Sequence, residues 1–206
     1  MSVPVRRRTL SRELALQFLF MLELRGSEAM EELIPFVEHH TKGSRDKKGR
    51  GELAEFTLSL SRGVVENRPE LDLWIEAIAR NWRLDRMAHV DRNILRLAVF
   101  ELLFHPDTPY KVVINEAIDI AKRFSTAQSG SFVNGILDRA RIMIEQAREE
   151  AGGHPTPPQE KAFAEPPTPT PRGRSSSAGA HGDAIPFSSV PVPRPRRRDT
   201  TTEDPS

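Results

Sequence analysis

VDRNILRLAVFELLFHPDTPYKVVINEAIDIAKRF, residues 90–124, is the most informative stretch of the sequence for the fold. Its first half is almost continuously apolar up to Phe104, which is typical of a central helix that other helices surround. Asp91 is placed to cap that helix at its start. Thr108, which a proline follows, predicts the N-cap and first turn of a second helix that ends at Phe124. The stretch therefore predicts consecutive helices packed in one core.

The segments on either side of this stretch repeat the helical pattern. Apolar residues recur there with a period of about 3.6 residues, and no segment alternates with the period of two that a strand shows. Three such segments precede the stretch: residues 8–25, 28–40 and 52–67. Trp74, Ile78 and Trp82 follow at helical spacing, which predicts that all three face the core. A polar turn precedes a last helix that begins at Phe132, so we expect an all-α protein of about seven helices.

The composition changes sharply near residue 150. Of the 17 prolines, 12 fall in residues 151–206, together with many Ser, Thr and Gly and no apolar periodicity. We expect a helical domain over residues 1–150 and a disordered tail over 151–206, in which PVPRPRRR (191–198) adds a basic cluster. No apolar run approaches the roughly 20 residues of a membrane span, and the chain has no cysteine. These features predict a cytoplasmic protein without disulfides or membrane association.

Positive charge gathers at the start of the chain, although the net charge is only +1. Residues 1–12 contain Arg6, Arg7, Arg8 and Arg12 and no acidic residue. Arginines at the start of a helix are repelled by the positive end of the helix dipole, so they do not stabilise the helix. Binding of an external anion explains their presence better. Arg6 and Arg7 are expected in a flexible arm, and Arg8 and Arg12 on one helix face. The guanidinium group pairs with phosphate and stacks on bases, which predicts nucleic-acid binding; a merely solvated basic end is the alternative.

The residue types that enzymes and metal sites need do not occur in suitable arrangements. His39 and His40 are adjacent, so they point to different sides of a helix, which is a poor geometry for a metal. Polar residues inside apolar helices, such as Arg92, Arg96 and Glu116, lack an accompanying nucleophile and oxyanion hole and are interpreted as structural. Glycine-rich phosphate loops and the common hydrolase signatures are absent as well. We expect no enzymatic activity, no cofactor and no metal.

Five blocks of the sequence carry a resemblance to a known family. They are RRRTLSRELALQFLF (6–20), NWRLDR (81–86), VDRNILRLAVFEL (90–102), PYKVVINEAIDIAKRF (109–124) and FVNGILD (132–138). In this order and spacing they resemble the NusB family of transcription antitermination factors. The resemblance implies two packed helical bundles, the second from about residue 70 onward. It also implies binding to the boxA element of ribosomal RNA leader transcripts together with NusE, a small-subunit ribosomal protein, and action on the RNA polymerase elongation complex.

Candidate RNA contacts combine the arginines with aromatic and lysine residues inside these blocks. Aromatic rings stack on single-stranded bases, although each of these rings could equally fill the core, and the lysines could be ordinary surface residues. The candidates are Arg6, Arg7, Arg8, Arg12, Phe20, Tyr110, Lys111, Lys122 and Phe132. If all four arginines neutralised phosphates, log affinity would fall with log salt at a slope of about −3. Sequence preference is expected from Tyr110, Phe132 and NusE, and affinity mainly from the arginines.

Three features of the sequence leave alternatives open. Two extra residues separate the RRR run from Arg12 and Glu13, so the assignment of single arginines to family positions is ambiguous. The turn after Phe124, STAQSGS, lacks the charged residues that many relatives carry. A NusB-like domain also precedes the catalytic part of some ribosomal-RNA cytosine methyltransferases, and a purely protein-binding scaffold is a third class. Both a monomer and a homodimer are compatible with such bundles.

Overall fold

The computed structural model describes residues 3–42, 46–79 and 82–158, with side chains from Arg7 onward. These residues form seven α-helices and two 3-10 helices and contain no strand. The elements are α1 (Val3–Arg25), η1 (Ser27–Glu32), α2 (Leu33–Thr41), α3 (Lys47–Glu66), α4 (Arg68–Ile78), η2 (Leu84–Arg86), α5 (His89–Phe104), α6 (Tyr110–Phe124) and α7 (Ser129–Ala151). The predicted all-α class is confirmed.

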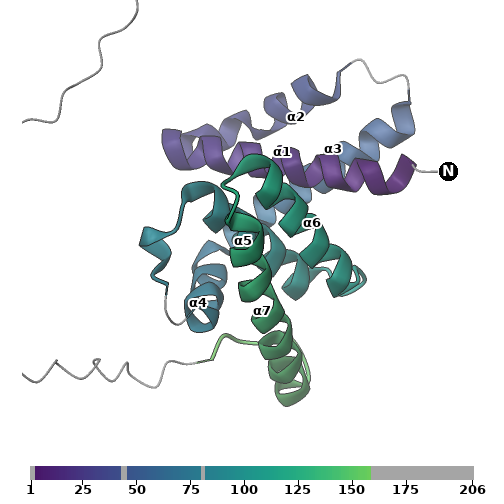
Figure 1. The fold of residues 1–206 in the computed structure, drawn as a ribbon. Helices are drawn as coiled ribbons and strands as arrows, with labels where there is room; N and C mark the ends of the chain where they lie inside the picture. Colours follow the sequence, from purple (N-terminus) through teal and green to yellow (C-terminus); the bar gives the residue numbers. More distant parts are fainter. Residues whose placement is uncertain (1–2, 43–45, 80–81, 159–206) are drawn as a thin grey trace, which may run out of the picture. The chain divides into compact units, whose positions relative to one another are not determined.

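The first bundle consists of α1, α2 and α3, which lie together at the top of Figure 1. Phe18 on α1 packs with Leu33 and Val37 on α2 in a cluster of its own. Asp46 caps α3, because its side chain accepts a hydrogen bond from the Gly49 amide at 3.0 Å. This cap starts α3 five residues before the start that apolar periodicity predicts.

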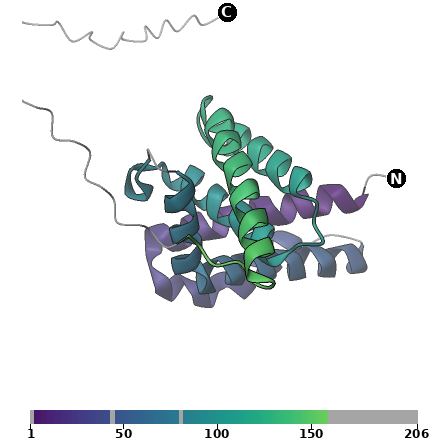
Figure 2. The same cartoon turned by 90° about the horizontal axis from the view of Figure 1, so that it is seen from below.

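The second bundle consists of α4 to α7 around the central α5, and its two-bundle arrangement agrees with the expected fold. Every residue of α5 from Asp91 to Leu103 is buried, which explains its nearly continuous apolar sequence. Figure 2, seen from below, shows α7 in front of the first bundle. The bundles meet where α3 crosses α5: a Cβ on Gly63 would come within 2.0 Å of the Phe100 ring, so only glycine permits this approach.

Two predicted details of the second bundle are wrong. Trp74 and Ile78 are buried as predicted, but α4 ends at Ile78, and Trp82 lies in the following segment with 56% of its surface exposed. Asp91 lies within the first turn of α5 rather than at its N-cap, and its carboxylate accepts a hydrogen bond from the Ser129 hydroxyl at 2.9 Å. Asp91 therefore ties the start of α5 to the start of α7.

The folded part continues slightly past the predicted boundary at residue 150. Gly152 adopts the left-handed conformation with φ 60°, which ends α7 and reverses the chain. His154 Nε2 then lies 2.9 Å from a carboxylate oxygen of Glu70, its ring packs on Phe104 at 4.9 Å, and Pro155 is buried. The predicted disorder of residues 159–206, including 191–198, lies outside the described residues. No helix of the described part is long and apolar enough to cross a membrane.

Candidate nucleic-acid interface

Arg12, a predicted RNA contact, is instead buried between the two bundles, with 3% of its surface exposed. Its Nε and Nη2 atoms each donate to one carboxylate oxygen of Glu101 on α5 at 2.7 Å, and Nη1 donates to Glu116 on α6 at 3.4 Å. The Thr9 hydroxyl donates to the other Glu116 oxygen at 3.1 Å. Because these carboxylates occupy the guanidinium fork, Arg12 is not available to phosphate, and the prediction for this residue is corrected.

Arg7 is engaged as well, and α1 begins at Val3, so the expected flexible arm is part of a helix. The Arg7 guanidinium pairs with Asp46 and, at 3.0 Å, with Glu52 on α3. The hydrogen bond from the Gly49 amide, helped by the charge of Arg7, lowers the pKa of Asp46 against a smaller effect of desolvation. Arg7 therefore fastens α1 to the start of α3. The side chain of Arg6 lies outside the described residues.

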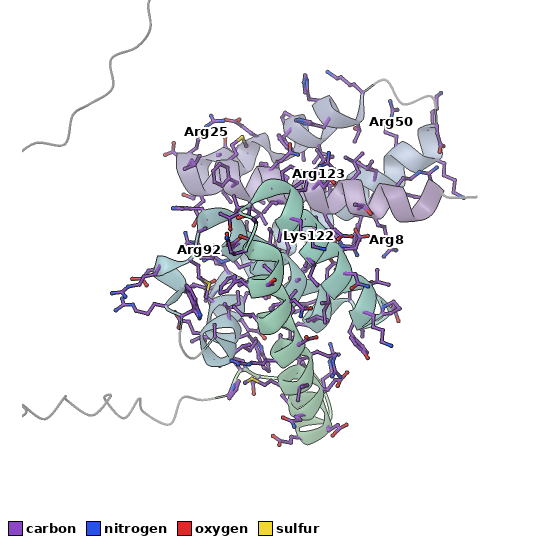
Figure 3. The ribbon with its side chains drawn as sticks, viewed as in Figure 1. Arg8, Arg25, Arg50, Arg92, Lys122 and Arg123 are labelled. Atoms are coloured by element: carbon purple, nitrogen blue, oxygen red, sulfur yellow. The ribbon has the colours of Figure 1, made fainter. Side chains whose placement is uncertain are left out.

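Arg8, unlike Arg7 and Arg12, is exposed, and it projects from the N-terminal end of α1 (Figure 3). Its guanidinium carbon lies 4.8 Å from the centre of the Phe56 ring, and that of Arg12 lies 5.4 Å from the same ring. Arg8 and Arg12 thus share a helix face as predicted, but one is buried and the other is not. Arg8 combines an exposed charge with a stacked, ordered geometry, which suits a single-stranded nucleic acid.

Lys122 and Arg123 lie at the C-terminal end of α6, beside α1 (Figure 3). Arg123 pairs with Glu13 of α1 while its side chain stays 65% exposed, and Lys122 lies 3.7 Å from Asp119. The Lys122 stem lies against Gly130 in the first turn of α7, where a Cβ would stand 3.1 Å away. These contacts place two exposed cations between α1 and α7.

Phe132 follows on α7, half-buried, and its ring meets the exposed Trp82 edge to face at 5.2 Å. Contacts thus run from Glu13 of α1 through Arg123 and Lys122 of α6 to Gly130 of α7, and the Phe132–Trp82 pair lies at the start of the same helix. We call this set the basic track; its members are Arg8, Arg123, Lys122, Phe132 and Trp82. The basic track offers positive charge at one end and exposed ring surface at the other, the two requirements of single-stranded RNA binding.

The remaining candidates lie elsewhere. Tyr110 and Lys111 are exposed at the opposite end of α6, where the Arg141 guanidinium stands 4.7 Å from the Tyr110 ring centre. Their distance from Lys122 along the helix is roughly 17 Å, at about 1.5 Å per residue. Phe20 is half-buried on α1. The structure therefore does not bring these three residues into the basic track.

Other polar residues of α5 form a structural cluster, as interpreted from the sequence. Burial alone would raise the pKa of Glu23, but hydrogen bonds from Arg92 and Asn93 and the charge of Arg92 outweigh it and lower the pKa. Arg96 forms a bidentate pair with Asp72 of α4, with Nε and Nη2 at 2.6 and 2.9 Å. These contacts join α1, α4 and α5. Within the described ranges no group of three or more His, Cys, Asp or Glu is placed to hold a metal.

Two members of the basic track and the ring beneath Arg8 are not indicated by the sequence. Trp82 has the helical spacing of a core residue, Arg123 lies beside the candidate Lys122, and Phe56 has the position of an inward-facing residue of its helix. The basic-aromatic run KRF at 122–124 is the one local signal that could have indicated Arg123. Phe56 and Trp82 contact residues that are distant in the sequence, so no local pattern reveals the role of either ring.

The fold and the basic track define an all-α protein of two helical bundles with a cationic and aromatic surface. A sequence profile described as the NusB family matches residues 9–141. A transcription antitermination protein NusB from Desulfatibacillum aliphaticivorans is 46% identical over 138 residues, covering 67% of this chain and 92% of the relative. Another, from Myxococcus xanthus, is 43% identical over 141 residues, covering 67% and 96%. The chain belongs to the NusB family.

Solved structures agree with this assignment. T. maritima NusB is 42% identical and superposes with a TM-score of 0.55, covering 69% of this chain and 93% of that chain. A structure described as antitermination factors NusB and NusE in complex with dsRNA is 28% identical, with a TM-score of 0.56 over 66% of this chain and 97% of that chain. The matches cover nearly the whole length of these proteins and leave the C-terminal part of this chain unmatched.

Proposed function

We propose that this protein is a cytoplasmic, non-enzymatic antitermination factor that binds single-stranded RNA along the basic track. Its target is the boxA-type element of ribosomal RNA leader transcripts, bound together with NusE, and the complex acts on the elongating RNA polymerase. The observation that carries the proposal is that Arg123 and Lys122 of α6 lie between Glu13 of α1 and Gly130 of α7, with the exposed Arg8 on α1 and the Phe132–Trp82 pair at the start of α7. Phosphate contacts supply affinity at the cationic end, and stacking supplies base contacts at Trp82 and Phe132.

Arg7 and Arg12 are left out of this interface, because carboxylates already neutralise them. Tyr110 and Lys111 form a second exposed group, which a longer RNA or NusE would contact. The relatives bear the name of antitermination proteins over nearly their whole length, which favours this function over that of a methyltransferase domain. A purely protein-binding scaffold would leave the exposed cations of the basic track without a role.

The test is a binding titration of the full chain with a boxA-like RNA and with a scrambled RNA of equal length, each with and without NusE. We expect tighter binding to the boxA-like RNA and a further gain when NusE is present. Equal, weak binding to both RNAs would contradict the proposal and favour the scaffold. Co-purification with NusE measures the protein contact separately.

A further inference from the structure

A cavity of about 540 Å³ lies between α1 and α3, beside the cationic end of the basic track. Its volume falls within the range of about 300–1,000 Å³ that is typical of small-ligand sites. Its lining consists of Arg7, Arg8, Ser11, Glu52, Glu55, Phe56 and Ser59. Apart from Arg8, none of these lining residues belongs to the basic track.

One wall of the cavity is a stacking surface. The Arg8 guanidinium lies over the Phe56 ring at 4.8 Å, and His105 holds the ring edge to face at 6.0 Å. Phe56 is half-buried and Arg8 is exposed, so the outer face of the guanidinium remains open. Planar guanidinium groups of this kind stack on the unpaired bases of single-stranded RNA.

The cavity contains one carboxylate, that of Glu55, whose hydrogen-bonding capacity is not used within the described part of the protein. Glu52 pairs with Arg7 at 3.0 Å, and the Ser11 hydroxyl donates to the Leu53 carbonyl at 3.0 Å. The Glu55 carboxylate has no hydrogen bond or ion pair with any residue that the structure describes. An exposed carboxylate accepts two parallel N–H groups, and guanine is the RNA base whose Watson–Crick edge offers two adjacent donors, N1–H and the N2 amino group.

The local charge argues for a base rather than a phosphate. Two arginines face the cavity, but Asp46 and Glu52 already pair with Arg7, and Glu55 adds another negative charge. A phosphate inside the cavity would meet these carboxylates at close range. Arg8 lines the cavity and is exposed, so its N–H edge is open to a backbone phosphate while its outer face is open to a base.

We propose that this cavity binds one guanine of the RNA, stacked on the Arg8–Phe56 pair and read by the Glu55 carboxylate. The inference rests on RNA binding along the basic track and adds a base preference to it. Glu55 is then a specificity-determining residue, and Phe56 a positioning residue that acts through Arg8.

The RNA test replaces each guanine of the bound RNA in turn by inosine, which lacks the N2 amino group, and by adenine. At one position the wild-type protein should lose affinity on the order of 10-fold with adenine and less with inosine. Glu55→Gln should bind the guanine and adenine RNAs equally, at the affinity that the wild type shows for the adenine RNA. Glu66→Gln, an exposed change on the same helix, should keep the wild-type preference. RNA binding without a preference at any guanine, or a preference that Glu55→Gln retains, overturns the inference.

A second measurement separates this inference from RNA binding as a whole. In an NMR titration of the full chain with free guanosine, shifts should centre on Arg8, Glu55 and Phe56, should be lost in Glu55→Gln, and should be absent with adenosine. If guanosine causes these shifts but the protein binds no RNA, guanine binding in the cavity is supported and the proposed function is contradicted. If guanosine causes no shifts at these residues, guanine binding in the cavity is contradicted, whatever the result with RNA.

Discussion

Arg12 and Glu101 form a buried bidentate ion pair that joins the first helix to the central helix of the second bundle, with both N–O distances at 2.7 Å. Because of this pair, the arginines at the start of the chain do not form a uniformly exposed basic run. Arg12 holds the bundles together, Arg7 fastens α1 to α3, and Arg8 remains exposed beside the cavity. Along one helix, therefore, Arg7 and Arg12 are paired with carboxylates and Arg8 between them is exposed.

The first prediction concerns the stability that Arg12 provides. Arg12→Ala leaves Glu101, 1% exposed, as a buried carboxylate without its partner, which should lower the free energy of unfolding by about 3–5 kcal/mol. Urea denaturation measures the change. Arg8→Ala, an exposed change one turn away, should stay within about 0.5 kcal/mol. The double variant Arg12→Met with Glu101→Leu should recover most of the lost free energy of unfolding, because it removes both buried charges. If Arg12→Ala leaves the free energy of unfolding unchanged, the pair does not stabilise the protein.

The second prediction is a pH dependence that comes from Glu23. Its pKa in the folded protein lies below the ordinary value of 4.5, so the folded state favours the carboxylate. The stabilisation is fully present above pH 4.5 and is lost as the pH falls below that value through the folded-state pKa. Unfolding measured from pH 6 to about pH 3 should show less acid sensitivity in Glu23→Gln than in the wild type. Parallel pH curves for the two proteins would contradict this assignment.

The third prediction concerns the residues after α7. Truncation after Gly153 removes the His154 contacts with Glu70 and Phe104 and the buried Pro155, which should cost about 1–2 kcal/mol and lower the Tm. Truncation after Pro158 keeps these contacts and is the matched control. Equal melting temperatures for the two truncated chains would mean that the segment contributes nothing to the fold.

The fourth prediction concerns the aromatic end of the basic track. Trp82→Ala and Phe132→Ala should each weaken RNA binding by about 1–3 kcal/mol, since each removes ring surface on which a base stacks. Because Trp82 is 56% exposed and Trp74 is buried, RNA should also quench Trp82 fluorescence in a Trp74→Phe protein. Ile142→Ala, an exposed change on α7, is the control. If both aromatic variants bind RNA with wild-type affinity, Trp82 and Phe132 do not belong to the RNA interface.

The sequence predicted the helices well because apolar periodicity is a local property. The buried run of α5, the break before α6 and the amphipathic pattern of α1 all follow from neighbouring residues. Helix ends were predicted less well where a cap or a turn decides them. Asp46 starts α3 early, and the end of α4 at Ile78 moves Trp82 out of the helical pattern and into solvent.

The candidate site was predicted only in part, because its decisive contacts join distant parts of the chain. Arg12 meets Glu101 and Glu116 at sequence separations of 89 and 104 residues, so the local pattern could not distinguish it from Arg8. Both lie on one helix face within a basic run and differ only in what tertiary packing places opposite them. The same reason hid the stacking of Arg8 on Phe56.

The most direct test of RNA binding along the basic track is the salt dependence of RNA affinity between 50 and 200 mM, in the wild type and in single alanine variants. Arg8→Ala and Lys122→Ala should each reduce the slope of log affinity against log salt by about 0.7, the value for one phosphate contact to a single strand. Arg50→Ala, which removes an exposed cation of α3 away from α6 (Figure 3), should leave the slope unchanged. Wild-type slopes in Arg8→Ala and Lys122→Ala, or an equal reduction in Arg50→Ala, would contradict the account.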